Sequence, residues 1–238
     1  MDKIKLGVLV GGTSIEREVS KKSCENLLAN LDENKYDITV YHLPADGNTE
    51  WAKNIISNPP QIVLSALHGG NGENGSIQGF LHCLNIPYIG SKVLSSAICM
   101  NKAMAKTVMK ANHIQVPDHV FVMRGVDFSQ YEESIKLMGF PLIVKPNRGG
   151  SSIGVIVARN MEDIHYGIKN IMETYDDDVL IEKFIDGKEI NCCVLQGENG
   201  PEAMAVLDVK KAGSVFVYDD KYHIDEYSSD ITNLPDFM

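Results

Sequence analysis

Apolar and polar residues in the first hundred positions follow the order strand, glycine-rich turn, helix. Ile4–Val10 is an apolar run that predicts a strand, and residues 17–31 follow with apolar and small side chains at helical spacing. Runs at 37–43 and 62–67 predict two more strands, with a helix carrying Trp51 between them. The last of these strands is almost wholly apolar, as a strand buried on both faces should be. The pattern predicts a doubly wound α/β domain.

The pattern changes in the second part of the chain, and for that reason alone we place a domain boundary near residues 93–100. The helix that carries Met104 is predicted to bury its methionines and alanines in a core. Another helix should begin after Asn160 as the N-cap residue, with an aspartate three residues on. Residues 179–195 predict a hairpin that is closed by an Asp-Gly turn.

Length and charge exclude several classes of protein. The 238 residues suggest one to two ordinary domains. The net charge of −10 argues against nucleic acid or an anionic membrane as the main partner. The apolar runs are too short to span a membrane, and the first one ends in glycines, so it predicts a strand and not a signal peptide. We therefore expect a cytoplasmic protein with no nucleic-acid or membrane partner.

The five cysteines are an odd number and lack C-x-x-C spacing. We expect all of them to be small buried residues in a reducing compartment.

The stretch PLIVKPNRGGSSIGVI at 141–156 predicts two strands joined by a glycine-serine loop. Lys145 ends the first strand. Gly149 and Gly150 are expected to take backbone shapes closed to other residues, and Ser151 and Ser152 to offer hydroxyl and N–H groups. Converging N–H groups and a cation suit a polyphosphate. The alternative is a mobile hairpin loop with a solvated lysine.

Two more glycine-rich loops follow the first and third predicted strands, at the sheet edge where ligands gather. Glu16 lies in the first loop and either faces a ligand or is a first-turn acid favoured by the helix dipole. His68 precedes the second, which we expect to be flexible, and is either a substrate contact or a structural histidine. Glu182 and Lys183 are adjacent in a strand, so their side chains should point to opposite faces. They are either a surface pair or part of a strand edge that offers backbone groups to a base.

Taken together, seven stretches in order resemble the D-alanine–D-alanine ligases of the ATP-grasp family. They are GGTSIEREVS (11–20), HGGNGENGSIQGFL (68–81), PYIGS (87–91), ICMNKAMAKTVM (98–109), PLIVKPNRGGSSIGV (141–155), VLIEKFIDGKEI (179–190) and DDKY (219–222). The resemblance implies a doubly wound α/β amino-terminal domain at 1–95, followed by an α+β ATP-grasp fold. That fold would comprise a central subdomain at 96–178 and the incomplete start of a carboxyl-terminal subdomain at 179–238.

The resemblance also implies a function and its residues. The family uses ATP to join two D-alanines through an acyl-phosphate, which supplies peptidoglycan precursors, with Mg²⁺ or Mn²⁺ as cofactor and a tendency to form homodimers. The residues that match positions contacting the substrate are Glu16, His68, Ser151 and Tyr222. Those that match phosphate contacts are Lys102, Lys145, Ser151, Ser152 and Lys221. The adenine pocket would be lined by Glu182, Lys183 and Ile185, and the ribose held by Glu189.

Three departures from the family pattern limit these expectations. Asn74 and Asn101 stand where the family usually has aspartate, which predicts looser hydrogen bonds there, and the spacing before Lys221 is one residue short. The family's metal ligands, an aspartate, a glutamate and an E-x-N motif, would lie beyond Met238. We therefore expect this chain alone to release no phosphate in response to D-alanine. The alternatives are a ligase for another amino acid or hydroxy acid, or an inactive nucleotide-binding fragment.

Overall fold

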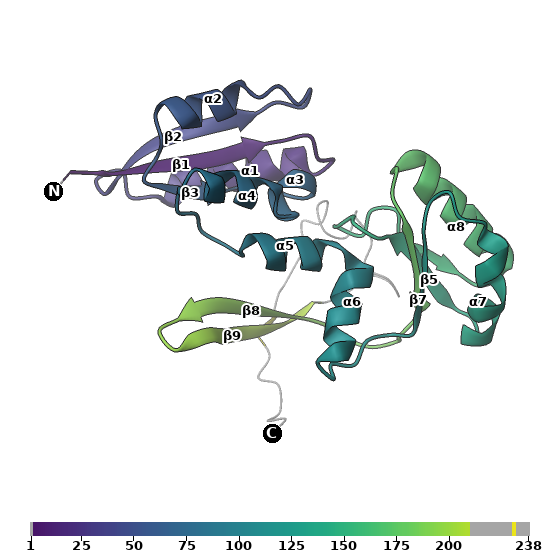
Figure 1. Cartoon of the computed structure of the whole chain (residues 1–238). Coiled ribbons are helices and arrows are strands. Elements are labelled where there is room, and N and C mark those ends of the chain that lie inside the picture. The colour runs from purple at the N-terminus through teal and green to yellow at the C-terminus, as the bar shows by residue number, and fades with distance from the viewer. Residues whose placement is uncertain (1, 210–229, 232–238) are drawn as a thin grey trace. The chain divides into compact units, whose positions relative to one another are not determined.

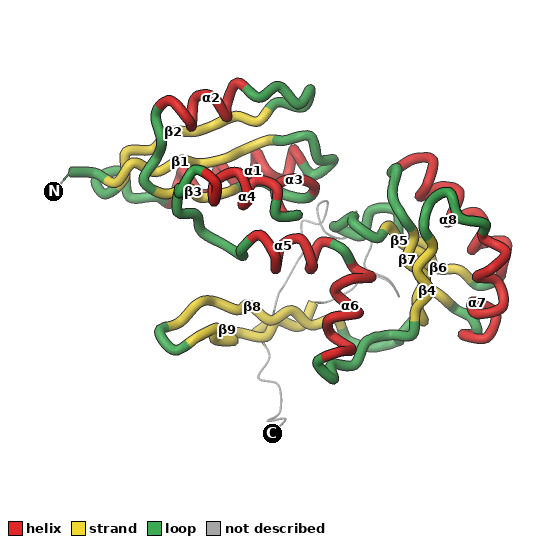
Figure 2. Tube along the Cα trace, viewed as in Figure 1, coloured by secondary structure: helices red, strands yellow, loops and turns green. Residues whose placement is uncertain are grey.

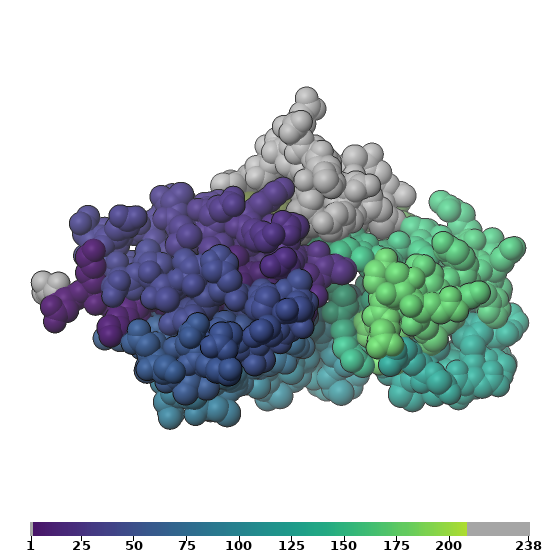
Figure 3. All heavy atoms as spheres, turned by 90° about the horizontal axis from the view of Figure 1, so that it is seen from above, coloured from purple at the N-terminus to yellow at the C-terminus, as the bar shows by residue number. Residues whose placement is uncertain are grey.

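The computed structural model describes residues 2–209 and 230–231, which are coloured in Figure 1, and Figure 3 shows residues 2–209 in the same colours. The chain forms two compact units. The first unit comprises residues 1–116 together with 147–150, and the second comprises 117–146 together with 151–238. The predicted strand at 216–222 lies outside the described residues. The three-part division expected from the resemblance stays a prediction.

The first unit is built on a parallel sheet with the order β2-β1-β3. Its strands are β1 (Ile4–Gly11), β2 (Tyr36–Leu43) and β3 (Ile62–Ser65). Its helices are α1 (Arg17–Asn30), α2 (Glu50–Ser57), α3 (Gly70–Glu73), α4 (Ser76–Cys83), α5 (Val93–Met100) and α6 (Lys102–Ala111). The element order of the sequence prediction is confirmed for the first three strands and the helices between them.

Alternate residues of β1 pack into two different cores, one on each face of the sheet. Val8 belongs to a cluster with Cys24 of α1, whereas Leu9 belongs to a cluster with Ile55 of α2 and Leu81 of α4. Side chains alternate between the faces of a strand, so β1 must be covered on both sides. This arrangement confirms the doubly wound α/β prediction.

Two expectations for the end of this unit are wrong. The apolar stripe around Met104 was predicted as core, but no residue of α6 is buried, and Met104 itself is 50% exposed. The chain also breaks at Asn101 into two helices instead of continuing as one. Before these helices, Tyr88 makes an isolated parallel bridge with Val63.

The second unit contains an antiparallel sheet with the order β4-β7-β5-β6, covered by two helices (Figure 2). Its strands are β4 (His119–Val122), β5 (Leu142–Pro146), β6 (Ile156–Ala158) and β7 (Val179–Lys183). Its helical segments are the 3₁₀ turn η1 (Phe128–Tyr131), α7 (Glu132–Met138) and α8 (Met161–Thr174). Fully buried Leu142, Ile135 of α7 and Ile164 of α8 belong to one core cluster.

The start of α8 was predicted correctly. The Asp163 backbone N–H donates to Asn160 Oδ1 at 2.9 Å, and the Arg159 N–H donates to Asp163 Oδ2 at 2.7 Å. These reciprocal bonds satisfy amide groups that have no partner within the helix. On the inner face of the helix, Ile168 and Ile171 are buried.

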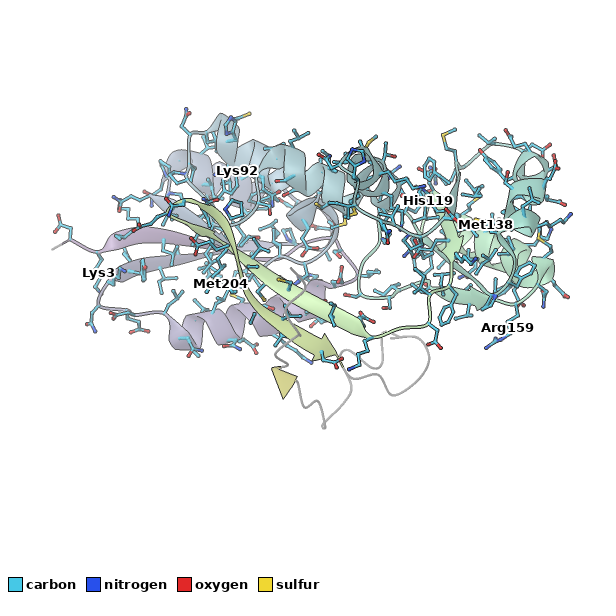
Figure 4. All side chains as sticks on the ribbon, turned by 90° about the horizontal axis from the view of Figure 1, so that it is seen from below. Lys3, Lys92, His119, Met138, Arg159 and Met204 are labelled. Carbon is cyan, nitrogen blue, oxygen red and sulfur yellow. The ribbon has the colours of Figure 1, made fainter. Side chains whose placement is uncertain are left out.

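The predicted hairpin at 179–195 is wrong, because its two strands belong to different sheets. β7 pairs with β4 and β5, while β8 (Glu189–Gly197) pairs with β9 (Gly200–Val209), which is flanked by β10 (Asp230–Ile231). The two strands differ in burial, and this difference explains why they do not pair with each other. The apolar residues that open β7 are fully buried and need a partner on each side, whereas β8 and β9 expose much of their surface, including Met204 (Figure 4).

The expectation that all five cysteines are buried is also wrong. All five are free thiols, but Cys24 alone is buried, and burial raises the pKa of its thiol. Two of the exposed thiols, Cys192 and Cys193, lie on the open β8–β9 hairpin, where little packs against either face. Among the helices that the structure describes, each is too short or too polar to cross a membrane.

Candidate active site

The carboxyl edge of the first unit's sheet is held by side chains of the loop and helix that follow β1. The Gly11 N–H donates to the buried hydroxyl of Ser20 at 2.8 Å, so α1 is fastened to the strand end. Between them the Glu16 N–H donates to Ser14 Oγ at 3.1 Å. Glu16 is the N-cap residue of α1 and is only 7% exposed.

The Glu16 carboxylate faces away from its own helix and toward two glycine loops. Its side chain makes no capping hydrogen bond to α1. A Cβ added at Gly69 would lie 2.2 Å from Glu16 Oε2, and one at Gly150 would lie 3.6 Å from the same atom. Gly69 also has a φ of +65°, so this close approach requires glycine. The ligand-facing role of Glu16 stays a prediction, and the carboxylate lies beside both glycine loops.

The loop after His68 is folded, which corrects the expectation of a flexible segment. Residues 70–73 form the short helix α3, in which the Gly72 N–H donates to Gly69 O at 3.1 Å and the Asn74 N–H donates to Gly70 O at 3.0 Å. The Gly69 N–H donates to Glu73 Oε2 at 2.9 Å. His68 is half-buried, with its Nε2 2.8 Å from Ser23 Oγ.

A cavity of about 150 Å³ lies between the loops that follow the three parallel strands. Gly12 and Ser14 line it after β1, Asn48 and Trp51 after β2, and His68 after β3. A cavity of this size holds a ligand of roughly the dimensions of benzene. A hollow with both polar and apolar walls therefore lies at the carboxyl edge of the sheet, where the sequence predicts a site.

Lys102 and the base of the Gly-Ser loop meet in the same unit through Asn147, a residue that the sequence did not single out. Asn147 is fully buried. Its Oδ1 accepts from the Ala103 N–H at 2.9 Å, its Nδ2 donates to Asn101 Oδ1 at 3.0 Å, and its carbonyl accepts from the Lys102 N–H at 3.0 Å. The Lys102 ammonium donates to the carbonyl of Gly149. The candidate phosphate cation is therefore fixed at the base of the loop.

The two asparagines that replace aspartate make the local hydrogen bonds that we expected to be loosened. Asn101 Oδ1 accepts from the Met104 N–H at 3.0 Å, and Asn74 Oδ1 accepts from the Ser76 N–H at 3.0 Å. An amide oxygen can accept these bonds as a carboxylate would. The bonds are made at both positions, and their being looser than those of an aspartate stays a prediction.

In the second unit Lys145 forms an ion pair with Glu182. Ile143 is the cross-strand partner of Glu182, and Lys145 lies two residues further along β5 on the same face, so the pair is diagonal. The two side chains are 20% and 10% exposed. The prediction that Glu182 and Lys183 point to opposite faces is confirmed, because Glu182 is buried and Lys183 exposed. The surface-pair alternative is wrong.

In the Gly-Ser loop, the two serines and not the two glycines before them have a positive backbone φ. Ser151 and Ser152 have positive φ values of 50° and 57°, whereas Gly149 and Gly150 do not have positive φ, which corrects our expectation. Non-glycine residues in this region cost on the order of 1–3 kcal/mol each and gather at functional sites. Successive amides in such turns form anion-binding concavities.

The remaining predicted residues are dispersed. Ile185 is 63% exposed, and Glu189 lies in the second sheet of the unit, at the start of β8. Tyr222 and Lys221 lie outside the described residues. Asn147 was missed because its partners lie more than 40 residues away in the sequence, so no local pattern announces them.

Comparisons with known proteins match both the amino-terminal and the carboxyl-terminal part of the chain. A family profile described as D-ala D-ala ligase N-terminus matches residues 49–91, and one described as D-ala D-ala ligase C-terminus matches residues 108–235. The D-alanine–D-alanine ligase of Bacillus anthracis is 37% identical over 233 residues, which cover 98% of this chain and 73% of that protein.

Solved structures agree with these sequence matches. The crystal structure of D-alanine–D-alanine ligase from Bacillus anthracis complexed with ATP superposes with a TM-score of 0.76 at 31% identity, covering 98% of this chain and 72% of that one. The VanG D-Ala:D-Ser ligase from Enterococcus faecalis gives a TM-score of 0.77 at 27% identity, covering 97% and 76%. The fold is that of the ATP-grasp ligases, and the chain belongs to the D-alanine–D-alanine ligase family.

Proposed function

We propose that this protein uses ATP to join two D-alanine molecules through an acyl-phosphate, making the dipeptide of peptidoglycan precursors. One observation carries the proposal. Within the first unit, the buried Glu16 carboxylate lies beside Gly150 of the Gly-Ser loop, and the Lys102 ammonium is bound to the neighbouring Gly149. An amino-acid anchor and a phosphate cation at one loop are what phosphoryl transfer to an amino-acid carboxylate requires.

The first D-alanine is held through its charged ends. Glu16 receives the ammonium, because attraction between opposite charges is stronger at a buried carboxylate than in water. His68 lies near the carboxylate, and Ser151 and Tyr222 belong to the same substrate set.

ATP is held by cations, amides and the start of the carboxyl-terminal subdomain. The proposed phosphate contacts are Lys102, Lys145, Ser151, Ser152 and Lys221. Glu182, Lys183 and Ile185 line the adenine pocket and Glu189 holds the ribose. An ammonium has three donors, so Lys145 can keep its bond to Glu182 while it contacts a phosphate. Placing cations against a reacting anion lowers the barrier to phosphoryl transfer.

The expected Mg²⁺ or Mn²⁺ would neutralise phosphate charge. The described ranges, 2–209 and 230–231, contain no group of three or more histidine, cysteine, aspartate or glutamate residues that could hold a metal ion. These residues therefore do not make a metal site by themselves.

Titration calorimetry of ATP and of D-alanine, followed by an assay of D-alanine-dependent phosphate release, tests the proposal. We expect both ligands to bind, and Glu16→Gln to weaken D-alanine binding while ATP binding is retained. Failure of the wild-type chain to bind ATP would refute the proposal. Binding of ATP without binding of D-alanine would favour the alternative of an inactive nucleotide-binding module.

A second candidate is a ligase that joins D-alanine to a different second substrate. The similarity to a ligase named for D-Ala and D-Ser favours it specifically. Mass spectrometry of products formed from D-alanine alone, and with added D-serine or D-lactate, separates the two. Where turnover is detected, the D-alanine dipeptide should dominate; a mixed product at equal substrate concentrations would support the second candidate.

A cytoplasmic location and a homodimer are further proposals. In the first unit, exposed apolar side chains such as Leu94 (72% exposed) on α5 and Met104 on α6 are compatible with a partner surface. Sedimentation equilibrium at micromolar concentration should give twice the mass of the chain, whereas a single-chain mass would reject the dimer.

A further inference from the structure

Three polar side chains of the first unit lie next to one another: Ser23 of α1, His68 after β3 and Glu73 of α3. Ser23 Oγ lies 2.8 Å from His68 Nε2, and His68 Nδ1 lies 3.9 Å from Glu73 Oε1. The second carboxylate oxygen of Glu73 accepts the Gly69 N–H at 2.9 Å. Both ring nitrogens of His68 therefore face a polar partner on the protein itself.

The chemistry of these partners selects one tautomer of the neutral ring. A carboxylate only accepts hydrogen bonds, so the nitrogen that faces Glu73 should carry the proton. The Ser23 hydroxyl can then donate to Nε2. At 3.9 Å the contact with Glu73 is too long for a hydrogen bond and acts as an electrostatic orientation of the ring. The charge-assisted bond from Gly69 holds Glu73 in place for this task.

Because of the position of the His68 ring, its contacts with Ser23 and Glu73 matter for ligand binding. His68 lines the cavity at the carboxyl edge of the sheet, together with Ser14 of the Glu16 loop. Gly69, the residue after His68, lies directly against the Glu16 carboxylate. A displacement of the His68 ring would thus move one wall of the cavity and the glycine on which Glu16 rests.

We propose that Ser23 and Glu73 are positioning residues that fix the His68 ring, with its proton on Nδ1, in the wall of the amino-acid site. The inference rests on the proposed function for its consequence, D-alanine binding, but not for the tautomer. Serine, histidine and a carboxylate also form nucleophilic triads in hydrolases. Positioning is the better assignment here because the histidine–carboxylate contact is too long for the bond that such a triad uses.

Nitrogen-15 NMR of histidine-labelled protein at pH 8 tests the tautomer directly, since an ordinary histidine is neutral there. His68→Gln identifies the resonances of this ring among the seven histidines. We expect wild-type His68 to be protonated on Nδ1, and both Ser23→Ala and Glu73→Gln to shift its resonances toward the average of the two tautomers. A wild-type ring protonated on Nε2, or resonances that ignore either substitution, would overturn the proposal.

Binding measurements test the consequence. Ser23→Ala and Glu73→Gln should each weaken D-alanine binding by about twofold to tenfold, as loss of one hydrogen bond suggests, with ATP affinity unchanged. Ser23→Thr keeps the hydroxyl and should restore D-alanine affinity. Glu25→Gln, an exposed residue of the same helix, is the matched control. Equal D-alanine affinity in wild type and both variants would overturn the consequence. If the wild type binds no D-alanine, the proposed function fails, while the NMR result still decides the tautomer.

Discussion

Asn147 shows how much of the site depends on one buried amide. Within the first unit it binds Asn101 and Ala103 at the start of α6, and its carbonyl accepts from the Lys102 backbone N–H. A buried polar side chain is stable only when its hydrogen bonds are made. Asn147 is fully buried and makes them, so the position of Lys102 follows from it.

Asn147→Ala should lower the free energy of unfolding by about 2–4 kcal/mol, because two side-chain hydrogen bonds are lost and buried partners are left unsatisfied. Urea unfolding followed by circular dichroism measures this change. Asn112→Ala is the control. This exposed side chain at the end of α6 donates one hydrogen bond, to Val108 O. Equal losses from the two substitutions would contradict the role given to Asn147.

Site residues that follow strand ends could be predicted, while their partners could not. Glu16 and His68 were singled out from the sequence because glycine loops after parallel strands mark the ligand edge of a sheet. Lys145 was singled out because it stands at the end of a strand, before the Gly-Ser loop. Ser23 and Glu73 belong to the same site through contacts with His68. Ser23 looks like any small residue on a helix, and its contact depends on the packing of α1 against the sheet.

At the scale of elements, α8 lies so close to the sheet that one of its residues must be glycine. A Cβ added at Gly167 would lie 2.9 Å from Val144 Cγ1, and Val144 is a fully buried, β-branched residue with little freedom to move. Helix propensity alone favours alanine over glycine by about 1 kcal/mol. Overpacking costs about 1–3 kcal/mol, so the packing cost decides whether alanine at position 167 stabilises or destabilises the protein.

Gly167→Ala should therefore destabilise the protein, by about 0.5–2 kcal/mol after the propensity gain. Gly79→Ala in α4 is the matched control, because nothing lies within 4 Å of its added Cβ, and it should stabilise by about 0.5–1 kcal/mol. Thermal melting of both variants gives the comparison. A higher melting temperature for Gly167→Ala would show that α8 can move away from β5.

The two glycine-rich loops should differ in hydrogen exchange. The amides of Gly69, Gly72 and Asn74 are hydrogen-bonded and should exchange slowly. Ser151 and Ser152 are strained and should exchange quickly, then gain protection when ATP binds. Exchange measured with and without ATP checks both expectations. Slow exchange at both serines in the free protein would indicate a rigid structural hairpin.

Elements were predicted better than their pairing. The helices and strands of the first unit follow from apolar periodicity, and the Asn160 cap follows from side-chain chemistry within a few residues. The hairpin at 179–195 was wrong because pairing is decided by burial. β7 pairs with two neighbouring strands in the core sheet, whereas β8, the strand after the Asp-Gly pair, pairs with β9.

At the scale of the whole molecule, each unit carries a different part of the proposed chemistry. The first unit contains Glu16, His68 and Lys102, and the second contains the Lys145–Glu182 pair and both loop serines. The net charge of −10 would repel ATP in general, so binding depends on these local cations. The match to the D-alanine–D-alanine ligase of Bacillus anthracis extends over 98% of the chain, so it includes residues of both units.

Titration calorimetry of ATP against wild type and Lys145→Ala tests the central claim most directly. Loss of a charge-assisted hydrogen bond should cost about 1.5–3 kcal/mol, which is roughly a tenfold to hundredfold loss of affinity. Lys169→Ala, which removes an exposed lysine of α8, should bind ATP as the wild type does. Circular dichroism must first show that Lys145→Ala, which deprives Glu182 of its cation, is still folded. Equal ATP affinity in wild type and a folded Lys145→Ala variant would contradict the account.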